Sequence, residues 1–327
     1  MNVALSRRRT LAALAGALAS PWAAAQAKWP AKPVRIVVPF GAGGVADLTA
    51  RAVGQKLGEQ MNQAFLIDNR PGAGGVTAGQ SVAQADPDGY TLLLMSNGTA
   101  VSEGLFQKLP FSAQKDFAPV SLLGTFDIAL VVPENSRYKT LGDLLADAKA
   151  RPGKLNIATI AVGSTQNLAA ELFKSTAGIQ AQIVPFNGTP AVVTALRGGS
   201  VDAGIEILAP IKSQITSKTL RALATFGEKR PTGLPDLPTA SETGGALKGL
   251  QIASWNALAA PAKTPQAIID RLNHECQVAL ASPDLKKKLA DLNVDARSSS
   301  PQELASLLAS ETRRWSGVIE RAKIPKM

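Results

Sequence analysis

The sequence contains very few of the residues on which most catalytic and metal sites depend. Its 327 residues include one histidine, His274, and one cysteine, Cys276. A single histidine leaves one possible base for a Ser-His-Asp or Cys-His arrangement, and no G-x-S-x-G motif accompanies it. No set of His and Cys residues has metal-ligand spacing. We therefore expect neither an enzyme nor a metal site, with His274 on a helix surface and Cys276 buried as a packing thiol.

Aromatic residues are scarce, and long apolar runs are missing beyond the N-terminus. Phe, Trp and Tyr make up 5% of the chain, and no cluster of Lys and Arg is interleaved with them. This composition argues against a nucleic-acid partner. No stretch after residue 27 is long and apolar enough to span a membrane. The formal net charge of +10 favours anionic ligands only loosely.

Residues 1–27 have the pattern of a secretory signal peptide. Arg7, Arg8 and Arg9 form a charged head, residues 11–19 form a short apolar run, and Ala25-Gln26-Ala27 is a cleavage site. The arginines also fit a twin-arginine signal, so the export route stays open. Cleavage removes three arginines and no acid, which lowers the formal net charge from +10 to +7. We expect the mature chain to be exported.

Short β-rich runs alternate with helical stretches along the mature chain, which predicts an α/β fold with largely parallel sheets. The expected strands are 34–38, 64–68, 91–95, 119–123, 128–132, 155–159, 181–185, 202–207, 220–225 and 252–259. The expected helices are 45–60, 76–85, 140–150, 166–176, 190–197, 209–215, 265–280, 284–291 and 301–321.

A chain of this length usually divides into two domains. Two apolar, extended stretches could pass between them, at 122–133 and 252–261. If both cross, one lobe contains 28–128 plus 254–327 and the other contains 129–253. A cleft between two α/β lobes is a common ligand site.

The stretch VVPFGAGGVADLTAR, residues 37–51, predicts a strand, a turn of small residues and a helix start. One interpretation is a dinucleotide site, since Gly41, Gly43 and Ala46 fit G-x-G-x-x-A and Asp68 lies where a ribose-binding acid is expected. The chain would then be an NAD-dependent dehydrogenase-like enzyme. The other interpretation is an anion site made of bare backbone amides at a helix N-terminus. A second Gly-Ala-Gly-Gly, 72–75, is interpreted as a tight turn into a closely packed helix.

Several stretches together resemble one family, the Bug proteins, which are the exported substrate-binding proteins of tripartite tricarboxylate transporters. The matching stretches include WPAKPVRIVVPFGAGGVADLTAR, DNRPGAGG, ADPDGYTLL, KLPFSAQKDFAPVSLL, IVPFNGTP and LPDLPTASETG. They lie in order along nearly the whole mature chain.

The resemblance implies a periplasmic-binding-protein type II-like fold, with two lobes and a hinge of two crossing strands. It implies a monomer without cofactor that captures a small organic carboxylate and delivers it to a two-subunit inner-membrane permease. A periplasmic sensor that presents its ligand to a receptor kinase is the alternative. The identity of the ligand stays open.

Carried onto this chain, the resemblance implies that two loops, one in each lobe, hold the ligand mainly through backbone amides. The first lobe would contribute Phe40, Gly41, Ala42, Gly43, Gly44 and Asp47, with Ser96, Asn97 and Thr99 in a pocket-edge loop. The second lobe would contribute Gly163, Ser164, Thr165, Gln166, Phe186, Asn187, Gly188 and Thr189. Glycine leaves the amides uncovered, and the positive end of a helix attracts a carboxylate without Lys or Arg.

Three polar residues need a separate explanation. Asp47 has the wrong charge for an anion site, so we expect it to cap its helix or to fix the loop. Asn167 stands where the family often has histidine, and Glu206 stands where it often has aspartate. If Glu206 lines the cleft, its charge favours a ligand with an amino or hydroxyl group beside the carboxylate. The equal alternative is that Glu206 faces a structural partner.

Overall fold

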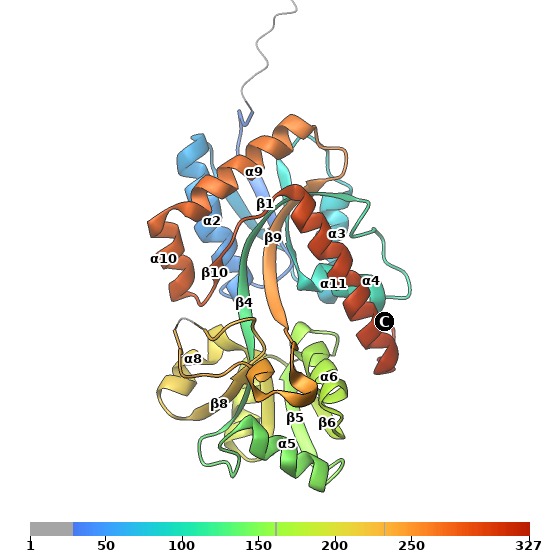
Figure 1. Cartoon of the computed structure of the whole chain (residues 1–327). Coiled ribbons are helices and arrows are strands. Elements are labelled where there is room, and N and C mark those ends of the chain that lie inside the picture. Colours follow the sequence, from blue (N-terminus) through green and yellow to red (C-terminus); the bar gives the residue numbers. More distant parts are fainter. Residues whose placement is uncertain (1–28, 161, 232) are drawn as a thin grey trace, which may run out of the picture.

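The computed structural model describes residues 29–160, 162–231 and 233–327. The predicted signal peptide lies outside these residues. The chain forms two α/β lobes, one above the other in Figure 1, joined by long strands. None of the described helices is long and apolar enough to cross a membrane.

The upper lobe is built from both ends of the chain (Figure 1). Its parallel strands are β1 (Val34–Val38), β2 (Phe65–Asn69) and β3 (Thr91–Ser96). Its helices are α2 (Val45–Met61), α3 (Val76–Ala83), α4 (Asn97–Leu105), α9 (Gln266–Ala281), α10 (Pro283–Asp291) and α11 (Pro301–Arg321). Apolar residues of α2 and α9 pack on β1 and β3 in one buried cluster. This packing fixes the direction in which α2 begins.

The lower lobe is built from the middle of the chain. Its strands are β5 (Leu155–Ile160), β6 (Ala181–Phe186), β7 (Ala203–Ile207) and β8 (Leu220–Thr225). Its helices are α5 (Leu141–Ala150), α6 (Thr165–Ala177), α7 (Thr189–Arg197) and α8 (Leu208–Thr216). Strand β5 pairs in parallel with β6 and β7, so α6 and α7 both begin at the carboxyl edge of these strands.

The hinge is formed by β4 (Phe117–Pro133) and β9 (Ala253–Pro261). Strand β4 pairs antiparallel with β9 up to Asp127 and with β7 and β8 from Ile128 onward. Phe226 links the segment that leads into β9 to strand β4. Ile252 N–H donates to Phe226 O, and Phe226 N–H donates to Ile128 O. We propose lobe boundaries at 128/129 and 253/254, within one residue of the point where β4 changes partners and of the start of β9.

The observed strands differ from the predicted ones in three respects. The strands expected at 119–123 and 128–132 are one continuous strand, β4. The sheet is mixed, because both hinge strands pair antiparallel. The short β10 (Asp295–Ala296), which pairs with β4, was not predicted.

The pocket-edge loop expected after β3 is in fact the start of helix α4. Ser96 is its N-cap and forms a reciprocal capping box with Thr99. Two glycines weaken the helical pattern of this segment, since glycine is a poor helix former. One of them, Gly104, lies so close to Ser316 of α11 that an added Cβ would be 2.8 Å from its hydroxyl oxygen. Packing on α11 therefore stabilises α4, and the local sequence cannot reveal it.

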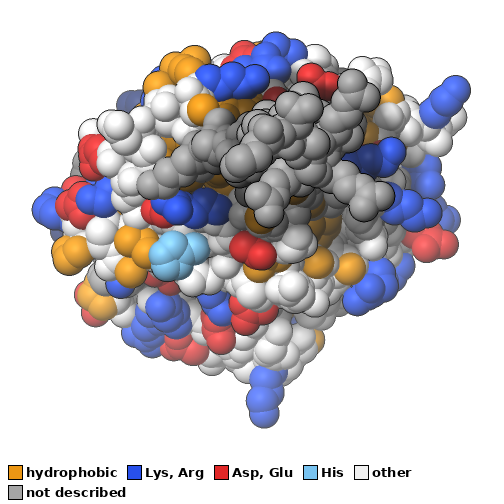
Figure 2. Space-filling view, turned by 90° about the horizontal axis from the view of Figure 1, so that it is seen from above, with side chains coloured by type: hydrophobic (Ala, Val, Ile, Leu, Met, Phe, Trp, Pro, Cys, Tyr) orange, Lys and Arg blue, Asp and Glu red, His pale blue; other side chains and the backbone are white. Residues whose placement is uncertain are grey.

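The predictions for the single histidine and the single cysteine are confirmed. His274 is exposed, and it lies on the face shown in Figure 2, where Lys and Arg are scattered among Asp and Glu. Cys276 is fully buried, and burial raises the pKa of its thiol to about 12. A thiol of this kind is unreactive at neutral pH.

The second Gly-Ala-Gly-Gly forms the expected tight turn into a helix. Gly74 and Gly75 have positive φ angles of 62° and 92°, and Gly75 is the N-cap of α3. One turn later, a Cβ added at Gly79 would lie 2.5 Å from the ring of Phe111. That ring packs edge-to-face on Phe117, with centroids 5.4 Å apart, and has little freedom to move.

Gly79→Ala should lower the free energy of unfolding by about 1–3 kcal/mol, because it overpacks the core against Phe111. The clash should outweigh the gain of about 1 kcal/mol that alanine brings to a helix. Chemical denaturation measures the change. The matched control is Gly142→Ala in α5, where a Cβ would meet only Thr140 Oγ1 at 3.5 Å. Equal stability of the two variants would contradict the prediction.

Candidate ligand-binding site

The loop between β1 and α2 is held by the side chain of Asp47. The Asp47 carboxylate accepts from Gly43 N–H at 2.8 Å, from Arg51 Nε at 3.0 Å and from Asn69 Nδ2 at 3.0 Å. The same Asn69 nitrogen donates to Phe40 O at 3.0 Å. Burial alone would raise the pKa of Asp47, but the hydrogen bonds from Arg51, Gly43 and Asn69 lower it overall. Asp47 is thus a charged residue that fixes the loop.

Residues Phe40 to Gly44 remain exposed, with 40% of the Phe40 surface accessible. The N–H groups of Gly44, Val45 and Ala46 have no acceptor among the described residues. Free amides at a helix start carry partial positive charge. The loop therefore offers a set of donors that suits an anion.

The loop before α6 repeats this arrangement in the lower lobe. Gly163 has a positive φ of 78°, close to the 85° of Gly43. Its N–H donates to Asn167 Oδ1 at 3.1 Å, four residues along the chain, as Gly43 does to Asp47. Ser164 caps the helix by accepting from Asn167 N–H at 3.1 Å. The asparagine at 167 thus has a clear structural role.

The two lobes contact each other beside these loops. Asn97 is fully buried, and its Nδ2 donates to Thr165 Oγ1 of the lower lobe at 3.1 Å. Its Oδ1 accepts from Trp315 Nε1 at 2.8 Å. A Cβ at Gly163 would overlap the side chain of Leu105. Glycine at 163 is therefore needed both for its positive φ and for this contact between the lobes.

Glu206, near the end of β7, connects the starts of α6 and α7. Its Oε2 accepts from Gln166 Nε2 at 3.3 Å and from Thr189 Oγ1 at 3.0 Å. The residue is fully buried, and its Oε1 has no hydrogen-bond partner within the described part of the chain. Burial raises the pKa of Glu206 to about 7, and the donors at Gln166, Thr189 and Ile207 N–H oppose this only in part.

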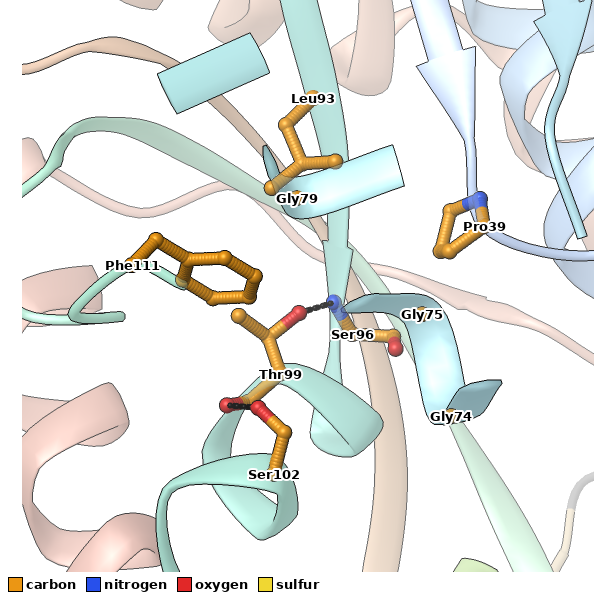
Figure 3. A pocket seen from close by; sticks show the side chains of 9 residues that line it. All are labelled: Pro39, Gly74, Gly75, Gly79, Leu93, Ser96, Thr99, Ser102 and Phe111. Atoms are coloured by element: carbon orange, nitrogen blue, oxygen red, sulfur yellow. Dashed lines mark hydrogen bonds between the residues drawn. The ribbon is translucent and has the colours of Figure 1, made fainter. Parts of the chain in front are cut away.

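The other predicted residues have different surroundings. Phe186 ends β6 and packs partly buried on the core of the lower lobe, whereas Asn187 is exposed. Ser96 and Thr99 line a cavity of about 10 Å³ inside the upper lobe, closed by Gly75 and Phe111 (Figure 3). A cavity of that size holds about one water molecule.

A larger hollow of about 410 Å³ lies against the hinge strands on the side of α11. Thr125, Trp255, Arg297 and Glu311 are among its lining residues, and none of the predicted site residues is. It is therefore separate from the two glycine loops.

Three residues that shape the site were not predicted from the sequence: Arg51, Asn69 and Trp315. The spacing of Asp47 and Arg51, four residues apart on one helix, could have indicated their contact. No local signal connects Trp315 to Asn97, because they are 218 residues apart.

Asp68, the acid of the dinucleotide interpretation, is bound to Arg70 Nε at 2.9 Å and to Arg35 at 3.5 Å.

Comparison with known proteins identifies the family. A sequence model described as "TctC: Tripartite tricarboxylate transporter family receptor" matches residues 49–324. The chain belongs to this family. Its members are solute-binding receptors of the periplasm rather than enzymes, as the resemblance to Bug proteins had predicted.

Individual relatives are similar to the receptor in sequence or structure over most of its length. Protein BugT of Bordetella pertussis is 34% identical over 89% of each chain. The solved structure of Rhodopseudomonas palustris Rpa4515 with adipate is 32% identical, with a TM-score of 0.81 over 91% of this chain and 100% of that one. MatC of the same organism, with bound malate, is 32% identical, with a TM-score of 0.76 over 89% and 100%. The two-lobe fold is therefore that of the receptor family.

The buried carboxyl of Glu206 should make the stability of the receptor depend on pH. Its pKa is 4.5 unfolded and about 7 folded, so its contribution is full below about pH 4.5 and is lost as pH rises through about 7. The loss is on the order of 3 kcal/mol. Glu206→Gln cannot ionise, so its melting temperature should exceed that of the wild type at about pH 8 and converge with it at about pH 5.

Thermal unfolding across this pH range, without ligand, measures the difference. The matched control is Glu320→Gln, at an exposed position of α11, and it should follow the wild type. If the difference in melting temperature between Glu206→Gln and the wild type does not change with pH, the pKa of Glu206 is not raised by folding.

Proposed function

We propose that the receptor captures a small organic carboxylate between its two lobes and delivers it to a two-subunit inner-membrane permease. The observation that carries the proposal is the repeated helix start, with Gly43 and Asp47 in one lobe and Gly163 and Asn167 in the other. Each glycine is locked by a side chain of the helix that follows it. The protein's own hydrogen bonds thus fix the donors of both lobes.

The proposed site uses backbone amides in place of cationic side chains. A carboxylate near Gly44 would accept from the free N–H groups of Gly44, Val45 and Ala46. From the lower lobe, residues 163–166 and 186–189 would approach its other end. Such donors act strongly because they are fixed and lie at positive helix ends.

Closure follows from ligand contacts that involve both lobes. A ligand shifts the equilibrium toward the closed form only by its extra affinity for that form. Asn97 and Thr165 already bond across the interface at 3.1 Å. The ligand therefore adds to an existing contact, and β4 and β9 act as the hinge.

The chemistry of two related proteins supports carboxylates as the class. Rpa4515 is described with adipate and MatC with malate, and both compounds are dicarboxylates. A ligand with two acid groups also suits a site with helix starts on both sides. Dicarboxylates are accordingly the first compounds to test on this receptor.

Gly44→Leu should abolish dicarboxylate binding while leaving the fold intact. Gly44 has an ordinary φ of −79°, and a Cβ there meets nothing closer than Gly41 O at 3.9 Å. The leucine would thus fit the backbone and cover the free amides. The matched control is Gly142→Leu, also exposed but at the start of α5 in the lower lobe.

A thermal-shift screen of residues 28–327 against dicarboxylates, amino acids and nicotinamide cofactors makes the comparison. A ligand of the native state raises the melting temperature by mass action. We expect dicarboxylates to stabilise the wild type and Gly142→Leu but not Gly44→Leu. Stabilisation of Gly44→Leu equal to the wild type, or of the wild type by nicotinamide cofactors alone, would refute the proposal.

A further inference from the structure

Glu206 is a fully buried carboxyl group without a cation. No ion pair among the described residues includes it. The groups around it are Gln166 of α6, Thr189 of α7, the N–H of Ile207 and, across the sheet, Ala129 of β4. None of these is charged, so nothing in the unliganded protein balances an ionised Glu206.

The two oxygens of this carboxyl group have different surroundings. Oε2 accepts from both Gln166, in the first turn of α6, and Thr189, the first residue of α7. These two helix starts form the lower half of the proposed site. Oε1 is buried, and no group among the described residues makes a hydrogen bond of normal geometry to it. Leaving a buried acceptor unpaired is costly, and more so for a charged one. An unpaired buried atom in a native protein calls for an explanation, and a donor supplied by a ligand is one.

We propose that Glu206 Oε1 accepts a hydrogen bond from a hydroxyl or ammonium group of the ligand, and that the receptor selects hydroxy- or amino-substituted carboxylates. This inference rests on the proposed function, because it needs the ligand to bind beside α6 and α7. The helix amides would hold the carboxylate of the ligand, and Glu206 would recognise its substituent.

The charge of Glu206 decides which part of the ligand faces it. An ionised carboxylate repels a second carboxylate and attracts a donor. The acid groups of the ligand therefore point to the helix amides, and the substituent points to β7. An analogue without the substituent leaves Oε1 unpaired, which lowers its affinity by about tenfold or more.

Three dicarboxylates with the same carbon skeleton test the proposal. Succinate has no substituent, malate has a hydroxyl group and aspartate has an ammonium group. Isothermal titration of the full mature chain, residues 28–327, measures the dissociation constant of each. We expect malate or aspartate to bind at least about tenfold more tightly than succinate.

Glu206→Gln isolates the role of Oε1. Glutamine keeps one oxygen as acceptor for Gln166 and Thr189 and replaces the unpartnered oxygen by an NH₂ donor. An ammonium group can only donate, so the preference for aspartate over succinate should disappear, with the affinity for succinate unchanged. Thr189→Val is the comparison variant, since it removes a donor to Oε2 and leaves Oε1. It should weaken all three ligands by a similar factor and keep their order.

Two results would overturn the inference while leaving the proposed function standing. One is a wild type that binds succinate as tightly as both substituted acids. The other is a Glu206→Gln variant that folds, binds and keeps the wild-type order. Failure of every carboxylate to bind the wild type would instead refute the proposed function, and this inference with it.

Discussion

The arrangement of the proposed site depends on one interaction, the hydrogen bond from a glycine N–H to a side chain four residues further along. Gly43 donates to Asp47, and Gly163 donates to Asn167. Both glycines have positive φ angles, which other residues rarely adopt. The bond turns each loop so that its helix begins with open amides. The site would otherwise need Lys or Arg, and none is among its proposed residues.

The hinge connects this interaction to lobe movement. Strand β4 belongs to the sheets of both lobes, and its partners change between Asp127 and Ile128. The lobes meet at Asn97 and Thr165, next to the loop that begins α6. A rotation about the hinge would therefore separate or join the two sets of amides directly. Contacts made on both sides are what a ligand needs in order to favour closure.

Local patterns predicted the elements whose ends are set by their own residues. Helix 301–321 was predicted at its observed bounds, because Ser300 caps it, Pro301 begins it and its apolar stripe is regular. Helix α4 was missed because its stability comes from α11, more than 200 residues away. The glycine loops were predicted as helix starts, and the loop-fixing role of Asp47 followed from its charge.

The contacts of Glu206 could not be predicted, because they join three elements that meet only through the pairing of β5 with β6 and β7. These contacts join the starts of α6 and α7, so the two loops before these helices are not independent of each other. One carboxylate oxygen accepts from both Gln166 and Thr189, and the other has no partner in residues 29–160, 162–231 and 233–327. The residue that lowers stability at neutral pH is thus the one proposed to select the ligand, as expected where function is maintained at a cost in stability.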